Sequence, residues 1–180
     1  MRTISKQVWT LLALAGAALA LAPWALAASG GQAGFGFNGS EISGFPTGAA
    51  FLTGGGAYNP ETGFVHAAGG FRCTAAVAQG PLAGCQAGQG VRWDTAELLA
   101  GTTFKCTGQA SEAAKAAATG ENTAVLLSDF YRAGDGIDES FTAQLIVSQD
   151  DIAPDIPGVQ NVWIQGVGCG SAIVHFNSSN

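Results

Sequence analysis

The sequence predicts an all-β domain: an antiparallel sandwich or a small closed barrel of about seven to nine strands, with at most one short helix, stapled by disulfides. Three observations support this prediction. Apolar and polar residues alternate in several stretches, glycine occurs 27 times while only 11% of residues are charged, and four cysteines follow an N-terminal export signal. Alternation with a period of two is typical of half-buried strands, whereas helices need the charged, helix-favouring residues that are scarce here.

Residues 1–27 have the organisation of a cleaved signal peptide. A basic start precedes an apolar run that ends near Leu21, and Ala25-Leu26-Ala27 supplies the small-x-small pattern that signal peptidase recognises. The run is short for a membrane anchor, so we expect cleavage and no membrane span in the mature protein. Residues 28–180 then form a single secreted β-domain, in the periplasm or outside the cell.

The first predicted hairpin begins with a strand over residues 49–58 and turns at Asn59-Pro60-Glu61-Thr62-Gly63. Proline presets the backbone for the turn, and glycine accepts the left-handed conformation that closes it. The returning strand, residues 65–77, places one set of residues on its buried face: Val65, Ala67, Gly69, Phe71, Cys73, Ala75 and Val77. His66, Arg72 and Thr74 fall on its other face.

The central part of the chain is less regular. Residues 91–99 fit either a strand or a helical turn capped by Asp94. Residues 102–107 alternate as a strand, with Phe104 and Cys106 on the buried face. Residues 109–119, QASEAAKAAAT, form the only segment with high helix propensity, and they predict the one short helix.

The last part predicts further strands. Residues 123–132 and 139–149 form a second hairpin, joined by a loop over residues 133–138. The final strands are expected at residues 161–167 and 172–176, interrupted by the glycines around Cys169.

All four cysteines lie in the mature part of the chain, and an even number behind an export signal predicts two disulfides. Phe71-Arg72-Cys73-Thr74 and Phe104-Lys105-Cys106-Thr107 share one pattern, with Phe and Cys on one strand face and a cation on the other. Because such strands fit as neighbouring or facing strands, we prefer the pairing Cys73–Cys106 with Cys85–Cys169.

The composition limits the possible partners. Thirteen acidic side chains against seven Lys and Arg give a formal charge of −6, which disfavours nucleic acid. We therefore expect an extracellular ligand or an envelope component as the partner. No cofactor is predicted, because the GxGxxG match at residues 34–39 lacks the following helix that a dinucleotide site requires.

Candidate binding residues combine aromatic rings with nearby polar groups, as sugar and peptide sites do. They are His66, Arg72, Trp93, Asp129, Tyr131, Arg132 and Trp163. No catalytic residue is predicted. Both histidines lie on strands among apolar neighbours, no GxSxG motif is present, and the cysteines are assigned to disulfides.

No metal site is predicted either, since there is no CxxC pair or Cys/His cluster. Asp135, Asp138 and Glu139 offer oxygen ligands in a turn but lack the alternating spacing of a calcium loop, so we interpret them as a solvated hairpin tip.

The favoured hypothesis is a non-enzymatic extracellular or envelope module that binds a ligand or has a structural role. One alternative is a small barrel enzyme or ligand carrier, for which a deep interior pocket would have to be lined by at least three of five polar candidates: His66, Arg72, Asp129, Tyr131 and Arg132. Another is a calcium-stabilised adhesin-like domain. A filled interior would favour the binding module.

Overall fold

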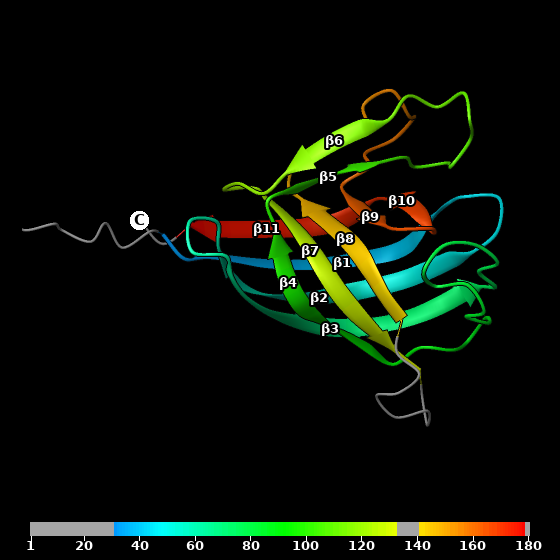
Figure 1. Ribbon diagram of the computed structural model, residues 1–180, viewed down its shortest axis with the longest axis horizontal. Helices are drawn as coiled ribbons and strands as arrows, with labels where there is room; N and C mark the ends of the chain where they lie inside the picture. The colour runs from blue at the N-terminus through cyan, green and yellow to red at the C-terminus, as the bar shows by residue number, and fades with distance from the viewer. Residues whose placement is uncertain (1–30, 133–140, 179–180) are drawn as a thin grey trace, which may run out of the picture.

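The computed structural model describes residues 31–132 and 141–178, and this part of the chain contains strands and no helix (Figure 1). The strands are β1 (Ala33–Gly44), β2 (Ala49–Asn59), β3 (Phe64–Ala75), β4 (Arg92–Leu99), β5 (Gly101–Phe104), β6 (Lys115–Ala118), β7 (Thr123–Tyr131), β8 (Phe141–Ser148), β9 (Val162–Ile164), β10 (Gly168–Gly170) and β11 (Ala172–Ser178). The all-β prediction is confirmed. No helix in the described part is long and apolar enough to cross a membrane.

The large sheet closes into a barrel, the second of the two predicted architectures. Its antiparallel strands follow the order β10-β9-β8-β7-β4-β3-β2-β1-β11, and β10 also pairs with β1. In that closing contact Ser43 lies opposite Cys169 and Gly44 opposite Gly168, whereas β11 pairs with the earlier part of β1, up to Gly39. Strands β10 and β11 therefore act as two halves of one interrupted strand beside β1.

The predicted alternation in β3 holds along the strand. Ala67, Phe71 and Cys73 are buried, while His66 and Arg72 are exposed on the outer face. The turn between β2 and β3 also forms as expected, with Gly63 at a φ of 73°. Only the end of the predicted strand differs, because Ala75 is exposed and the chain leaves the sheet after it.

The interior of the barrel is filled with side chains. Its largest fully buried residues include Trp93, Tyr58, Phe71 and Phe130. Their polar atoms are satisfied inside: the Tyr58 hydroxyl donates to the carbonyls of Gly120 (2.6 Å) and Glu121 (3.1 Å), and burial, with the charge of Glu121, raises the pKa of Tyr58 to about 12. Inside the barrel Phe71 and Phe130 pack edge to face, with ring centres 4.9 Å apart.

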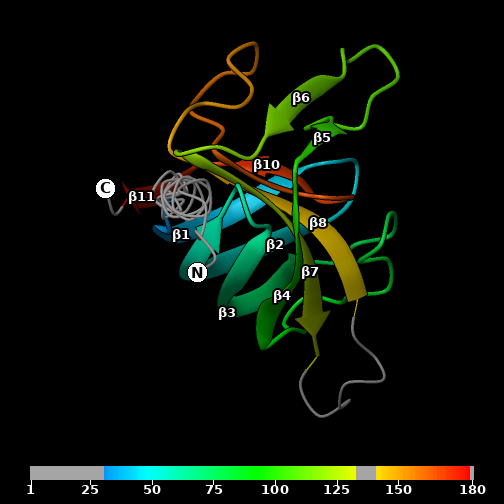
Figure 2. The ribbon, with the colours of Figure 1, turned by 60° about the vertical axis from the view of Figure 1, so that its left-hand side comes forward.

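Strands β5 and β6 form a separate hairpin that projects from the barrel (Figures 1 and 2). A second hydrophobic cluster lies between this hairpin and the outer barrel wall: Phe104, Cys106, Val125, Ile146, Ala153, Trp163 and Cys169. This explains why β7 is buried on both faces, since Val125 points to the hairpin while Leu126 points into the barrel.

The predicted helix over residues 109–119 is wrong. Lys115–Ala118 is strand β6, paired with β5 from Gly101 opposite Ala118 to Phe104 opposite Lys115. An isolated helix of this length is marginal, so the pairing with β5 outweighs the helix propensity of its alanines. The ambiguous residues 91–99 form strand β4, with a register shift between Thr95 and Glu97.

The predicted disulfide pairing is also wrong: the bonds are Cys73–Cys85 and Cys106–Cys169. Cys73 and Cys106 both point to the buried side of their segments, but they face different cores. Cys73 belongs to the barrel interior and Cys106 to the cluster outside the wall. Cys85 instead reaches Cys73 because the loop after β3 folds back along that strand.

Candidate binding site

The structure does not gather the seven candidate residues into one site. Trp93 lies inside the barrel, where its Nε1 donates to the carbonyl of Thr53 at 2.9 Å. His66 is exposed on the outer face of β3, and the Arg132 guanidinium lies 4.6 Å from the centre of the Phe141 ring. Asp129 and Tyr131 come together, whereas Arg72 and Trp163 line two separate hollows.

Asp129 and Tyr131 belong to a network on the outside of β4 and β7. The Tyr131 hydroxyl donates to Asp94 (3.2 Å), and Arg92 forms an ion pair with Asp94 (3.0 Å) while lying 4.2 Å from the centre of the Tyr131 ring. Burial, and then the charge of Asp94, raise the pKa of Tyr131. Asp129 accepts a hydrogen bond from Thr142. These groups satisfy one another, which suits a stabilising surface network.

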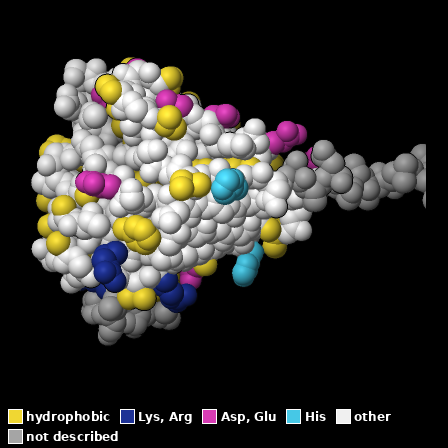
Figure 3. All heavy atoms as spheres, turned by 180° about the vertical axis from the view of Figure 1, so that it is seen from behind, with side chains coloured by type: hydrophobic (Ala, Val, Ile, Leu, Met, Phe, Trp, Pro, Cys, Tyr) yellow, Lys and Arg dark blue, Asp and Glu magenta, His cyan; other side chains and the backbone are white. Residues whose placement is uncertain are grey.

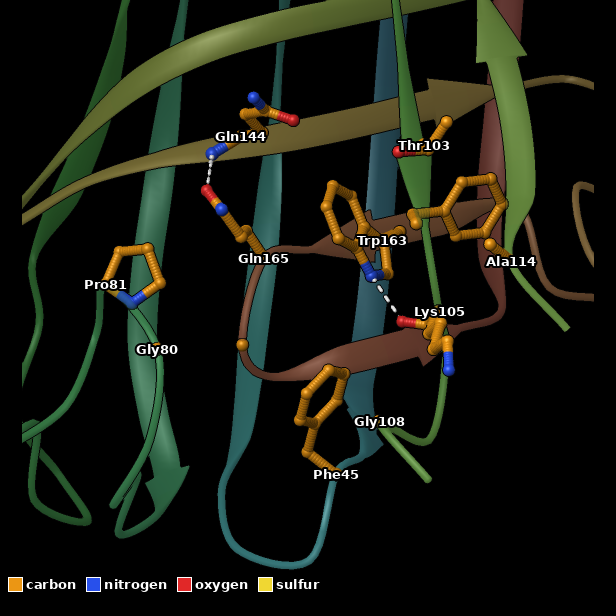
Figure 4. A pocket seen from close by; sticks show the side chains of 12 residues that line it. Phe45, Gly80, Pro81, Thr103, Lys105, Gly108, Ala114, Gln144, Trp163 and Gln165 are labelled. Atoms are coloured by element: carbon orange, nitrogen blue, oxygen red, sulfur yellow. Dashed lines mark hydrogen bonds between the residues drawn. The ribbon is translucent and has the colours of Figure 1, made fainter. Parts of the chain in front are cut away.

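The hollow at Trp163 is a candidate binding site, and we call it the hairpin cleft (Figure 4). It lies between β5, the β1–β2 and β3–β4 connections, and β8 and β9, and it has a volume of about 460 Å³. Trp163 and Phe104, both nearly fully buried, form its apolar floor, with ring centres 5.4 Å apart. Phe45 and Pro81, which are partly exposed, complete the apolar lining.

Two glutamine side chains bring hydrogen-bonding groups to this cleft. Gln144 of β8 accepts a hydrogen bond from Thr102 through Oε1, and Gln165 accepts one from the backbone N–H of Gln144 at 3.1 Å. Neither amide nitrogen has a partner among the described residues, so both remain available as donors. Thr103 adds a hydroxyl group.

Lys105 is the one charged residue among the described residues of the lining, and its ammonium group already makes hydrogen bonds. Its Nζ donates to the carbonyls of Gln109 (3.1 Å) and Ala110 (3.4 Å), while its own carbonyl accepts from Nε1 of Trp163 at 2.9 Å. The cleft is therefore largely apolar and offers neutral donors.

Close contact between two loops holds one wall of the cleft. Gly80 and Gly166 both have positive φ values, 70° and 81°, and a Cβ on Gly80 would lie 2.7 Å from Cα of Gly166. Only glycine permits this approach. The Gln79 amide secures it by donating to the carbonyls of Gly166 (2.6 Å) and Thr47 (2.7 Å).

The opposite wall is the β5–β6 hairpin. A disulfide and an ion pair join it to the rest of the protein, and hydrogen bonds to Glu112 hold it internally. The Cys106–Cys169 disulfide joins the segment after β5 to β10. Glu112 accepts hydrogen bonds from the backbone N–H groups of Cys106 (2.7 Å) and Thr107 (2.8 Å). Lys115 lies 3.0 Å from both Glu112 and Asp155, which ties the hairpin to the β8–β9 loop.

Of the cleft residues, only Trp163 was predicted from the sequence. Phe45, Gln144 and Gln165 come from segments far apart in the chain, and each alone has the sequence context of an ordinary loop or strand residue. Gln144 lies on the outer face of β8, between the buried Ala143 and Leu145. Its proximity to the cleft depends on the hairpin that covers that face.

No cluster of three or more His, Cys, Asp or Glu side chains suited to a metal ion occurs in residues 31–132 and 141–178. Asp135, Asp138 and Glu139 lie outside the described residues, so the calcium hypothesis remains a prediction. No protein-family model, curated protein or solved structure matches the chain.

Proposed function

We propose that this protein is an exported, non-enzymatic binding module whose hairpin cleft holds a small neutral ligand with an apolar face and several hydrogen-bonding groups, such as a saccharide unit. The free amide nitrogens of Gln144 and Gln165, above a floor of Trp163 and Phe104, carry this proposal. Aromatic rings next to neutral donors and acceptors suit the apolar faces and hydroxyl groups of sugars.

Two further features support binding without catalysis. The cleft volume lies within the range of small-molecule sites. Its walls are held by a disulfide and by hydrogen bonds, so little conformational entropy is lost on binding. The described residues of its lining include no carboxylate, histidine or free thiol that could act as a general acid, base or nucleophile. Export is supported by the leader pattern and by the disulfides.

Saturation-transfer difference NMR on the mature protein tests the proposal, with cellobiose, maltose and N,N′-diacetylchitobiose as probes. We expect at least one disaccharide to receive saturation. The signal should fall strongly in Phe45→Ala and Gln165→Ala, which remove an apolar wall and an amide donor. Phe64→Ala and Gln149→Ala, at exposed positions outside the cleft, are the matched controls. Absence of transfer for all three sugars, or equal loss in the controls, would refute the proposal.

A further inference from the structure

A second hollow lies on the outer face of the barrel, where β1, β2 and β3 lie side by side. Figure 3 shows this face. The two histidines lie near each other beside an area without coloured side chains, and Lys or Arg side chains lie next to hydrophobic ones on the other side of that area. We call the hollow the outer pocket. Its volume is about 670 Å³, and its lining includes Ser40, Phe51, Gly70, Arg72, Gly90 and Val91.

The outer pocket combines a cation with an apolar wall. Arg72 of β3 lies directly opposite Phe51 of β2 in the antiparallel register, so their side chains are neighbours on the outer face. Val91, 52% exposed, adds a second apolar surface. Ser40 and Thr74 contribute hydroxyl groups that make no hydrogen bond within the described residues.

Arg72 differs from the other described cations because it has no ion pair or hydrogen bond within the described residues. Arg92 is paired with Asp94, and Lys115 with Glu112 and Asp155. Among the described residues no carboxylate lines the outer pocket, although the protein as a whole is acidic. The guanidinium of Arg72 is therefore available to an anion from outside.

The pocket is built before any ligand arrives. The loop that forms one wall is joined to β3 by the Cys73–Cys85 disulfide and by backbone hydrogen bonds, from Gly88 N–H to the Cys73 carbonyl (2.7 Å) and from Cys73 N–H to the Gln89 carbonyl (2.7 Å). Gly70 lines the pocket without a side chain, and a Cβ there would lie 3.2 Å from the Thr53 methyl group. A preorganised wall lowers the entropy lost on binding.

We propose that the outer pocket is a second binding site, for a small monocarboxylate carried on a ring that has an apolar face. A guanidinium group matches the planar carboxylate in a two-point hydrogen bond, and the ring would lie against Phe51 and Val91. A single cation in a protein of net charge −6 favours a monoanion over a polyanion. The ring belongs to an aromatic acid or to a sugar acid, and both share this chemistry.

Two-dimensional NMR titration of the mature protein at constant ionic strength tests this site, with benzoate and D-glucuronate as probes. We expect saturable shifts at the amides of Gly70, Arg72 and Gly90 for at least one of them. Binding of benzoate alone identifies an aromatic acid, and binding of D-glucuronate alone identifies a sugar acid. Benzyl alcohol, glucose and acetate should each bind at least about tenfold more weakly. The first two lack the carboxylate that pairs with Arg72, and acetate lacks the ring that lies against Phe51 and Val91.

Variants separate this site from a general effect of charge. Arg72→Gln should weaken binding by about tenfold or more, and Arg72→Lys by less, because a single ammonium cannot match both carboxylate oxygens. Arg92→Gln removes the same charge from the neighbouring strand and should leave the affinity unchanged. An equal loss in Arg92→Gln, equal binding of neutral probes or acetate, or no saturation with either probe would overturn the proposal. Phe45→Ala, in the hairpin cleft, should leave carboxylate binding to the outer pocket unchanged. The proposals for the two sites can therefore be refuted separately.

Discussion

Two buried serines on neighbouring strands, Ser128 of β7 and Ser148 of β8, differ in what their hydroxyl groups contact. Ser148 Oγ lies 2.8 Å from Thr123 Oγ1 and accepts a hydrogen bond from the backbone N–H of Asp150 at 3.1 Å. Ser128 shares the inner face of β7 with Leu126, and its Oγ has no partner among the described residues. A buried hydroxyl without a partner is costly, whereas one with several partners is stabilising.

We predict that Ser128→Ala leaves the free energy of unfolding unchanged or raises it by up to about 1 kcal/mol, while Ser148→Ala lowers it by about 1–2 kcal/mol. Both substitutions remove one oxygen from a buried site, so each is the other's control. Urea denaturation of the two variants measures the difference. A larger loss in Ser128→Ala than in Ser148→Ala would contradict the assignment.

The carboxylate of Glu112 is held by several hydrogen bonds within the β5–β6 hairpin. Burial acts to raise its pKa, but hydrogen bonds from the Thr107 hydroxyl, from the backbone N–H groups of Cys106 and Thr107, and from Lys115 outweigh burial and lower the pKa from 4.5 to about 2. Because the folded protein holds the ionised form, this stabilisation is complete above about pH 4.5 and is lost as the pH falls toward 2.

We therefore predict that Glu112→Gln lowers the melting temperature at pH 6 and that the gap from the wild type narrows between pH 4.5 and 2. Thermal unfolding followed by circular dichroism over this pH range measures the gap. Glu121→Gln, at an exposed position where no such network forms, is the control. A gap that stays constant down to pH 2 would show that the carboxylate charge is not the stabilising feature.

At the scale of elements, the β5–β6 hairpin owes its form to its surroundings. Its second strand contains three alanines in a helix-favouring segment, yet it pairs with β5 and places Ala117 on the cluster around Trp163. The Cys106–Cys169 disulfide, which spans 63 positions, joins this hairpin to the barrel, while Cys73–Cys85 spans only 12 and closes a local loop.

The two disulfides should therefore differ in their contribution to stability. In the chain-entropy model, removing Cys106–Cys169 by a double substitution to alanine lowers the free energy of unfolding by about 4 kcal/mol, against about 3 kcal/mol for Cys73–Cys85. Guanidinium denaturation measures both losses, and hydrogen exchange should show reduced protection in β5 and β6 only in the first variant. The reverse order of stability would show that packing around the sulfur atoms in the folded protein, rather than loop length, decides the effect.

At the scale of the whole molecule, the barrel is a packed scaffold and both proposed sites lie outside it. Aromatic rings fill its interior, including Phe35, Tyr58 and Phe176, whose ring centres lie 5.7–6.1 Å apart. The sites occur where a connection or an extra hairpin is fastened against the outer wall. A rigid barrel that carries binding groups on its attached segments is a common way to separate stability from function.

Much of this fold could be predicted from the sequence, and much of the binding surface could not. The alternation of β3, the turn before Gly63 and the pairing of β7 with β8 follow from local patterns, and the structure confirms them. The lining of the hairpin cleft could not be found in this way, because Phe45, Gln144 and Gln165 carry no local signal of a shared site. Trp163 was identified as an aromatic ring near polar groups, and the same criterion also selected Trp93, which lies in the core.

The sequence by itself determined the class of structure. Alternation with a period of two indicates which residues are in strands and which face of each strand is buried, and the even number of cysteines indicates disulfides. The tertiary structure decided the barrel instead of the sandwich, the partners of the cysteines, and the strand at Lys115–Ala118. The physical reason is that local alternation indicates which face of a strand is buried, but it does not indicate which segment of the chain packs against that face. Only the closure of β10 on β1 and the placement of the hairpin on the outer wall bring the covering segments into contact.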